Sequence, residues 1–397
     1  MNMKVNPTVT VIITSQNHEK FVGEAIQSVL DQTFQDFEII IVDDCSSDTS
    51  WEIIKSFKDE RVRAFRNAQQ MRGAIGINES IAYRANGKYI AIHHSDDIFL
   101  PDKLEKQVRF LDSHHDVGAV FGYAEIIDEE GKPFAEKENF YFSIFKQPNR
   151  SRHEWLRHFF YHGNCLCHPS VMVRKVCYSA VGLYDRRFGQ IPDLDMWVRI
   201  CLNYSVHIIQ EPLIKFRLLS NDANSSSVKP EMQIRIVFEM GKMLNHYLSI
   251  EQFDELLKIF PEASKFGEDI EDELIPYVVA MLALDSPVFH SVHDCFGINA
   301  LFSLLQDNIT AQKLKDRFGF DYVDFVRLTG SQDVFNIVAV NRLSIDIQQL
   351  GLQLLEVKRP GSIVFVQVKD LQESIIRKVT ASVRRLLDFV ILKRPLE

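Results

Sequence analysis

The most constraining feature of this sequence is a pair of strand-like segments that each run into two adjacent aspartates. Residues 37–42 precede Asp43-Asp44, and residues 88–93 precede Ser95-Asp96-Asp97. Mostly apolar, β-branched runs of this kind are typical of strands buried on both faces of a parallel sheet. Ligands of open α/β sheets bind outside the carboxyl ends of the strands. Both acidic pairs are therefore predicted to lie at a ligand-binding edge.

Strand and helix patterns alternate over roughly the first 125 residues, which is typical of a parallel, doubly wound sheet. Residues 8–13 and 118–123 predict two further strands, and apolar residues at helical spacing over 21–30 predict a helix. From about residue 230 the helical period dominates. The expected parts are an α/β domain over residues 1–225, a helical accessory domain over 226–335 and a C-terminal helical tail over 336–397.

Composition excludes several classes of protein. The chain has 397 residues, of which 46% are hydrophobic and 25% charged, so a disordered or low-complexity chain is excluded. Asp and Glu number 54 against 45 Lys and Arg, a net charge of -9. Such a chain is not expected to bind nucleic acid through phosphate neutralisation. Any affinity for phosphate must be local, through a metal ion or a short basic segment.

Cysteine usage and hydropathy bear on the compartment. There are 6 cysteines without a C-x-x-C pair, far fewer than in a disulfide-stapled secreted domain. The first nine residues lack the apolar segment of a signal peptide. The most apolar window, residues 275–284, is about half the length needed to cross a bilayer. We therefore expect a cytoplasmic protein.

The two acidic pairs also indicate a cation. Adjacent carboxylates repel each other and prefer water to a protein core. A divalent cation relieves that repulsion, and Mg²⁺ or Mn²⁺ is commonly held by one or two carboxylates together with a diphosphate. The alternative is that these aspartates are solvated turn residues. Two pairs at two strand ends favour the cation.

Other ligand motifs are missing from the sequence. The turn after residues 8–13 is not of the glycine-rich dinucleotide type, and neither a Walker A sequence nor a G-x-S-x-G elbow occurs. The segments His93-His94 and Cys165-x-Cys167-His168 fit no standard zinc spacing. Residue patterns alone therefore leave an acidic, diphosphate-directed cation site as the leading interpretation.

Five segments carry a family resemblance. In chain order they are VTVIITSQNHEKFVGEAIQSVLDQTFQDFEIIIVDDCSSDTS, GKYIAIHHSDDIFLPDKLEKQV, HPSVMVRK, VGLYDRRF and PDLDMWVRI. Together they resemble family 2 glycosyltransferases of the GT-A fold, over about the first 225 residues. The resemblance implies an inverting, metal-dependent enzyme of bacterial surface-polysaccharide type, such as O-antigen or capsule synthesis. Its donor would be a nucleoside-diphosphate sugar, with a UDP-sugar favoured, and its acceptor a glycan or lipid-linked glycan.

The resemblance also assigns residue roles. Asp193 falls where the family has its catalytic base, and Asp96, with Asp97 beside it, where the family binds Mn²⁺ or Mg²⁺. The nucleotide-sugar side would be formed by Ser15, Asn17, Asp44, Asn78, His94, Asp96 and Arg217, with Asp44 on the base and Arg217 near the diphosphate. The acceptor side would be formed by His168, Asp195 and Trp197. Structural alternatives remain open for three of these residues: a helix cap for Asp193, a loop histidine for His168 and helix core for Trp197.

The sequence departs from the family pattern at several positions. His94 replaces the first aspartate of the Asp-x-Asp motif, Pro192 replaces a glutamate, and Leu219 replaces a histidine. Ile77 stands where the family usually has arginine before Asn78. These departures motivate an alternative function, a degenerate GT-A domain that binds sugar nucleotides or acts as a scaffold without turnover.

The segment 373–394 puts apolar residues on one side of a predicted helix and Lys and Arg on much of the rest. One interpretation is a helix that packs against the rest of the chain, or one that self-associates and makes the protein a homo-oligomer. The other is a peripheral contact with the anionic inner face of the cell membrane. A lipid-linked acceptor would suit the second interpretation.

Overall fold

The computed structural model describes residues 6–71, 74–135, 139–219 and 229–357. The chain forms two compact units, Met1–Glu239 and Met240–Glu397, and the boundary falls within one helix, α9 (Pro230–Met243). The predicted change from an α/β part to a helical part is confirmed. The predicted separation of residues 336–397 as a further part stays a prediction.

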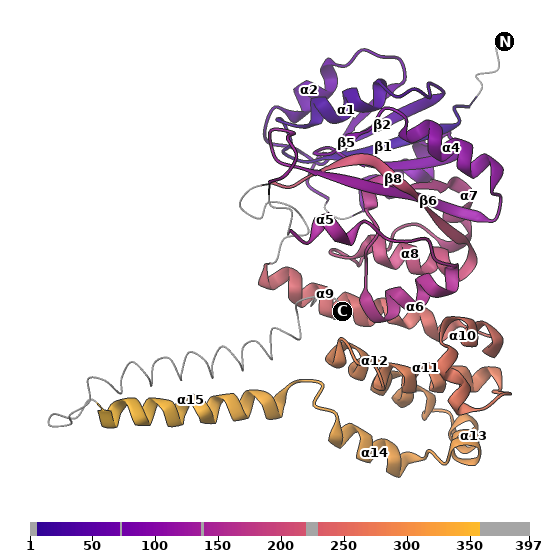
Figure 1. The fold of residues 1–397 in the computed structure, drawn as a ribbon, viewed down its shortest axis with the longest axis vertical. Helices are drawn as coiled ribbons and strands as arrows, with labels where there is room; N and C mark the ends of the chain where they lie inside the picture. Colours follow the sequence, from indigo (N-terminus) through magenta and orange to yellow (C-terminus); the bar gives the residue numbers. More distant parts are fainter. Residues whose placement is uncertain (1–5, 72–73, 136–138, 220–228, 358–397) are drawn as a thin grey trace. The chain divides into compact units, whose positions relative to one another are not determined.

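The first unit contains one mixed, mostly parallel sheet (Figure 1). Its strand order is β3-β2-β1-β4-β7-β6-β8-β5. Strands β3, β2, β1 and β4 pair with one another in parallel, and so do β6 and β8. Strand β7 is antiparallel to β4 and β6, and β5 is antiparallel to β8. The fold class expected from the sequence is thus confirmed. The strands are β1 (Val9–Ser15), β2 (Phe37–Asp43), β3 (Val62–Arg66), β4 (Tyr89–His94), β5 (Ile98–Phe99), β6 (Val117–Ile127), β7 (Met172–Arg174) and β8 (Ser205–Arg217).

Helices α1, α2 and α4 share a core with one face of this sheet. In α1 the buried residues Val22, Ala25, Ile26 and Val29 recur at helical spacing, which produces a single apolar stripe. Val22, Ile26 and Val29 of that stripe pack in one cluster with alternate residues of β1 and β2. The helical elements of the unit up to α9 are α1 (Val22–Leu30), α2 (Ser50–Ser56), α3 (Ile75–Glu79), η1 (Ser80–Arg84), α4 (Lys103–Ser113), α5 (Tyr141–Ile144), α6 (Arg152–His162), η2 (His168–Ser170), α7 (Lys175–Val181) and α8 (Pro192–Asn203).

Strand register places the two acidic segments at one edge of the sheet. Ser15, the last residue of β1, lies opposite Asp43 of β2. On its other side, β1 pairs with β4 so that Thr14 lies opposite His94. The carboxyl ends of three parallel strands therefore meet, with the aspartates after β2 and β4 flanking the end of β1.

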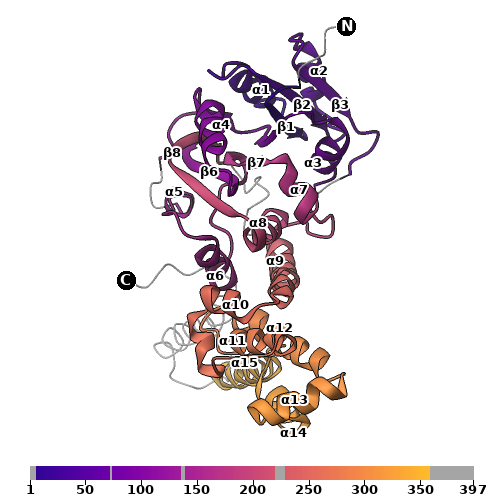
Figure 2. The ribbon, with the colours of Figure 1, turned by 90° about the vertical axis from the view of Figure 1, so that its right-hand side faces the viewer.

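The described part of the second unit, residues 240–357, is helical (Figure 2). Its central helix, α11, is almost entirely apolar and packs against α12. Most of the side chains of α11 are buried, as expected for a helix with apolar residues on all sides. The elements after α9 are η4 (Leu244–Ser249), α10 (Phe253–Ile259), η5 (Pro261–Phe266), η6 (Asp272–Leu274), α11 (Ile275–Leu284), α12 (His290–Leu304), α13 (Asn308–Phe318), α14 (Tyr322–Ser331) and α15 (Ile337–Val357).

The close approach of α11 and α12 depends on Gly297. A Cβ at this position would lie 2.8 Å from the carbonyl oxygen of Ala280 and 2.8 Å from Cγ of Leu284. Gly297→Ala is expected to lower the free energy of unfolding by about 1–3 kcal/mol, because the helices must separate. Gly330→Ala in α14 is the matched control, since nothing lies within 4 Å of its added Cβ. Chemical denaturation monitored by circular dichroism compares the two, and equal stabilities would contradict the prediction.

Within the described ranges, no helix combines the length and apolar character needed to span a bilayer. The predicted amphipathic segment 373–394 lies outside the described residues, so its interpretations stay predictions.

Candidate active site

A group of potential metal ligands follows β4. Side-chain ligand atoms of His94, Asp96 and Asp97 all lie within 4.8 Å of one another. Asp97 is 1% exposed, and its Oδ1 accepts a hydrogen bond from the backbone N–H of Arg217 at 2.9 Å. Among the described residues none donates a hydrogen bond to Oδ2, which lies 3.5 Å from Nδ1 of His94. Such an orphaned, buried carboxylate oxygen beside two further ligand groups fits a divalent cation.

The ionisation of Asp97 agrees with that fit. Burial and the neighbouring charge of Asp96 raise the pKa of Asp97 to about 6. The ionised form of Asp97 is thus less favourable than that of an ordinary aspartate. A bound cation stabilises the ionised form and reverses this shift.

The turn after β4, residues 95–97, carries Asp96 and Asp97 and is called the acidic turn below. His94 connects this turn to the segments around His168 and Tyr184. Its Nε2 lies 3.2 Å from Nδ1 of His168, and Nε2 of His168 lies 3.0 Å from the hydroxyl of Tyr184. Burial and the charge of His94 hold the pKa of His168 well below its usual range, so this imidazole is neutral. Burial opposes the charged form of His94, but the Asp97 carboxylate outweighs it and raises the pKa of His94. The histidine that departs from the family motif therefore belongs to a continuous polar chain.

Asp193 lies in the first turn of α8, near this chain. Its Oδ2 accepts a hydrogen bond from Nδ2 of Asn164 at 2.6 Å, and its Oδ1 accepts one from the backbone N–H of Leu194 at 2.9 Å. Burial raises the pKa of Asp193 to about 6, although these two hydrogen bonds and the charge of His94 each lower it. A carboxylate of this pKa is ionised at neutral pH and is a stronger base than an ordinary aspartate, as general base catalysis requires.

Arg217, at the end of β8, forms hydrogen bonds with the acidic turn. It is 1% exposed, and its Nε donates to the carbonyl of Asp96 at 2.8 Å. Its Nη1 donates to the carbonyls of Asp128 and Glu129, and its Nη2 pairs with Glu24 at 2.6 Å. The guanidinium thus holds the turn that carries the potential metal ligands Asp96 and Asp97. The predicted contact of Arg217 with a diphosphate stays a prediction.

The first acidic pair divides between two structural positions. Asp43 is fully buried, and its Oδ1 accepts a hydrogen bond from the backbone N–H of Ser46 and pairs with Arg66 at 3.2 Å. Asp44 is partly exposed and accepts hydrogen bonds from the Asn67 side chain at 2.7 Å and from the Met71 backbone at 2.9 Å. Asp44 therefore fixes the loop after β3 at the sheet edge, where its predicted contact with a nucleotide base would be made.

Comparison with known proteins identifies the family. The sequence model of the protein family named glycosyl transferase family 2 matches residues 10–174 of this chain. An uncharacterised glycosyltransferase of Methanocaldococcus jannaschii is 33% identical over 230 residues, which make up 57% of this chain and 76% of that protein. The chain belongs to glycosyltransferase family 2. The resemblance noted in the sequence, and the prediction that the protein is an enzyme of this class, are thereby confirmed.

Two further relatives of this family 2 glycosyltransferase have more specific names. TuaG of Bacillus subtilis, a putative teichuronic acid biosynthesis glycosyltransferase, is 28% identical over 235 residues, 58% of this chain and 87% of that protein. WfaP of Escherichia coli is named UDP-Glc:alpha-D-GlcNAc-diphosphoundecaprenol beta-1,3-glucosyltransferase. It is 35% identical over 105 residues, 26% of this chain and 41% of that protein. The relatives of the transferase thus include one named for teichuronic acid synthesis and one named for glucosyl transfer to a lipid-linked sugar.

Three predicted nucleotide-side residues of the transferase have well-defined places. Ser15 is buried at the end of β1, and within the described part of the chain its hydroxyl has no hydrogen-bond partner. Asn17 adopts a left-handed conformation (φ 53°), and its Oδ1 accepts the Ser47 backbone N–H at 2.8 Å. Asn78 holds the backbone of Tyr184 through two hydrogen bonds of 2.7 and 3.0 Å. Ser15 and Asn17 lie at the edge where the acidic segments meet, while Asn78 joins α3 to the Tyr184 segment.

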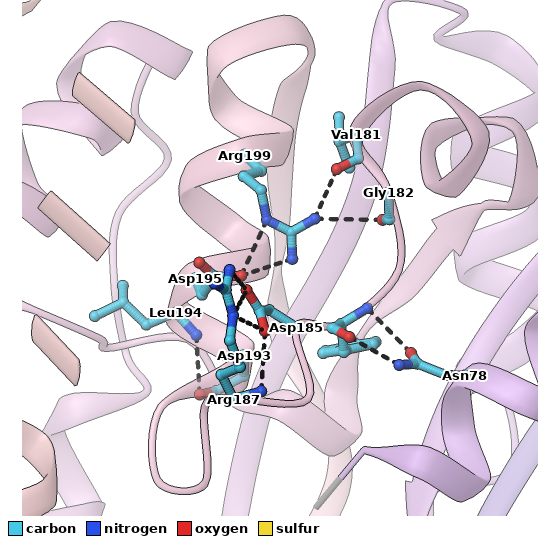
Figure 3. A network of polar contacts seen from close by, with 10 residues as sticks. Asn78, Val181, Gly182, Asp185, Arg187, Asp193, Leu194, Asp195 and Arg199 are labelled. Carbon is cyan, nitrogen blue, oxygen red and sulfur yellow. Dashed lines mark hydrogen bonds and ion pairs between the residues drawn. The ribbon is translucent and has the colours of Figure 1, made fainter. Parts of the chain in front are cut away.

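Two predicted acceptor-side residues of the transferase point into its interior. The Asp195 carboxylate pairs with Arg199, one turn along α8, at 2.6 Å, and Arg199 donates to the carbonyls of Val181 and Gly182 (Figure 3). Trp197 is fully buried and packs edge-on against Phe121, with ring centroids 4.8 Å apart. Both residues contribute to the core that supports α8, and their predicted contacts with an acceptor stay predictions.

Several contributors to the site carried no sequence signal. Asn164, which binds Asp193, is a single asparagine in a loop. His18 lies with its Nδ1 2.8 Å from the hydroxyl of Ser95, and so joins the loop after β1 to the acidic turn. The Asp195–Arg199 pair, by contrast, has i,i+4 spacing on one helix and could have been found from the sequence.

Proposed function

We propose that this transferase is an inverting, metal-dependent enzyme that moves a sugar from a nucleoside diphosphate onto a lipid-linked glycan. A UDP-sugar is the favoured donor, and surface polysaccharide synthesis is the setting. One observation carries the proposal: Asp193, whose pKa is raised to about 6, lies near the group of potential cation ligands formed by His94, Asp96 and Asp97.

In the proposed reaction, a single nucleophilic displacement at the anomeric carbon, each site residue would have a separate role. Ionised Asp193 would accept the proton of the acceptor hydroxyl as its oxygen attacks the anomeric carbon. Asp96 and Asp97, with His94 beside them, would hold Mn²⁺ or Mg²⁺, which stabilises negative charge on a leaving diphosphate. One displacement at the anomeric carbon inverts its configuration. Asp44, at the other side of the end of β1, would recognise the base.

The relatives support the choice of substrates. The name of WfaP gives UDP-glucose as donor and a diphosphoundecaprenol-linked sugar as acceptor, and TuaG is named for teichuronic acid synthesis. A lipid-linked acceptor would require access to the inner leaflet of the membrane. Co-sedimentation with anionic vesicles, comparing the full chain with one ending at residue 369, tests whether the tail provides that access.

Release of nucleoside diphosphate tests the proposed reaction. The protein is incubated with a panel of nucleotide sugars, a lipid-diphosphate sugar acceptor and either Mn²⁺, Mg²⁺ or a chelator. We expect acceptor-dependent release from a UDP-sugar that the chelator abolishes, and a product of inverted anomeric configuration by NMR. Turnover that is equal with the chelator, or a product of retained configuration, would contradict the proposal.

His94, Pro192 and Leu219 support a second candidate, a sugar-nucleotide-binding or scaffold protein without turnover. The two candidates differ in calorimetry and in turnover. A scaffold without a nucleotide site shows no metal-dependent heat of binding with UDP, and a pure binding module shows that heat but no transfer. The enzyme shows both.

A further inference from the structure

Glu239 is a buried acid supplied by α9, well beyond the segment that matches the family model. It is 3% exposed. Its carboxylate accepts hydrogen bonds from three consecutive backbone N–H groups: Gly189 to Oε1 at 2.7 Å, and Gln190 and Ile191 to Oε2, both at 2.9 Å. Hydrogen bonds to a charged acceptor are stronger than neutral ones, so this carboxylate fixes the backbone of three residues.

Those three residues lead directly into α8, whose first turn carries Asp193. The first N–H groups of a helix have no partner within the helix. Here Pro192 has no N–H, and the preceding Ile191 has no side-chain oxygen with which to cap the helix. The Glu239 carboxylate accepts the Ile191 N–H instead and places a negative charge at the positive end of the helix dipole.

The contact between α9 and the 189–191 segment is close. A Cβ on Gly189 would lie 3.3 Å from Cδ of Arg235 and 3.6 Å from Oε1 of Glu239. Arg235 also donates to the side chain of Gln190 at 3.3 Å. The backbone before α8 is therefore held against α9 by both packing and hydrogen bonds.

We propose that Glu239 is a positioning residue of the transfer reaction: it fixes the start of α8 and so the direction of the Asp193 carboxylate toward the acceptor hydroxyl. This inference depends on the role proposed above for Asp193. It makes catalysis depend on a helix that the sequence had assigned to an accessory domain.

Glu239→Gln tests the role of the carboxylate. Glutamine keeps one acceptor oxygen, so either the Gly189 bond or the Gln190 and Ile191 bonds are lost, and an NH₂ group faces a backbone N–H. A displacement of about 1 Å at a catalytic group can cost about 10²-fold in rate. We expect kcat to fall about 10- to 100-fold, with an unchanged KM for the donor and unchanged metal-dependent UDP binding. Glu231→Gln, on an exposed carboxylate of the same helix, is the control and keeps full turnover.

A double-mutant cycle with Asp193→Asn separates positioning from general support of the fold. If Glu239 acts through Asp193, Glu239→Gln has no further effect on the residual turnover of Asp193→Asn. Glu239→Asp keeps both acceptor oxygens and restores part of kcat. If circular dichroism shows that Glu239→Gln is misfolded, Glu239→Asp takes its place in the cycle under the same criteria.

Three results would overturn the inference: unchanged kcat in the tested Glu239 variant, a loss confined to KM for the donor, or additive losses in the cycle. A different result bears on the proposed function. If Asp193→Asn itself retains full turnover, Asp193 is not the base, whatever the Glu239 variants show.

Discussion

Asp193→Asn is expected to reduce turnover by about 10²- to 10⁴-fold, the usual contribution of a general base. Asparagine has nearly the same shape but cannot accept the proton of the acceptor hydroxyl. Metal-dependent UDP binding should be retained, because the proposed cation ligands lie at the end of β4 and in the turn after it, not in α8. Calorimetry and turnover of the same preparation measure the two properties together.

The pH dependence of kcat/KM is an independent test of Asp193 as the general base. Burial raises the pKa of Asp193 from 3.8 to about 6. Wild-type kcat/KM should therefore rise with pH and level off above about pH 6, as the carboxylate becomes ionised. This limb should be missing from the residual turnover of Asp193→Asn.

Stability should show the opposite trend. An acid with a raised pKa in the folded state binds its proton more tightly there than in the unfolded chain, so ionisation opposes folding. Relative to Asp193→Asn, the wild type should lose about 2 kcal/mol of unfolding free energy between about pH 4 and pH 6, and no more above that. Urea denaturation at a series of pH values measures the difference. A difference independent of pH would mean that the Asp193 carboxyl is not strained by its burial.

The sheet edge could be predicted from the sequence because its causes are local. β-branched runs specify the buried strands, and the aspartates follow them without an intervening loop. The structure places Ser15 opposite Asp43 and Thr14 opposite His94, so the predicted convergence of the acidic segments is observed. The two aspartates of the first acidic pair look equivalent in the sequence, yet Asp43 is buried and pairs with Arg66, while Asp44 holds a loop. That distinction depends on β3, a strand that no acidic pair follows in the sequence.

Long-range partners could not be predicted in this way. Arg217 lies 193 residues from its ion-pair partner Glu24, and no local pattern links the two. Its assignment to a diphosphate was based on family position, whereas the described contacts of its guanidinium include three backbone carbonyls. Glu239 is 48 residues from Ile191, in a segment whose helical period suggested only an accessory helix. Such residues become recognisable when burial and hydrogen-bond partners are known.

Removing the charge of Asp97 should have the second large effect. Asp97→Asn keeps the size of the side chain but replaces the buried, orphaned carboxylate with a neutral amide. A cation at such a site supplies several kcal/mol of transition-state stabilisation. Since about 1.4 kcal/mol corresponds to tenfold in rate, we expect turnover to fall on the order of 10³-fold. The Mn²⁺ concentration needed for half-maximal UDP binding should also rise.

Asp102→Asn is the matched control for this variant, because Asp102 is a nearby aspartate whose side chain is 45% exposed and pairs with Lys106. It should keep both Mn²⁺ dependence and turnover. His94→Asp adds the second carboxylate of the family motif and a further negative charge, which should lower the Mn²⁺ concentration needed for UDP binding. It also removes the imidazole contact with His168, so tighter metal binding should come with slower turnover. Faster turnover in His94→Asp would show that the polar chain from His94 through His168 to Tyr184 has no role in the site. Unchanged Mn²⁺ dependence in Asp97→Asn would show that the cation binds elsewhere.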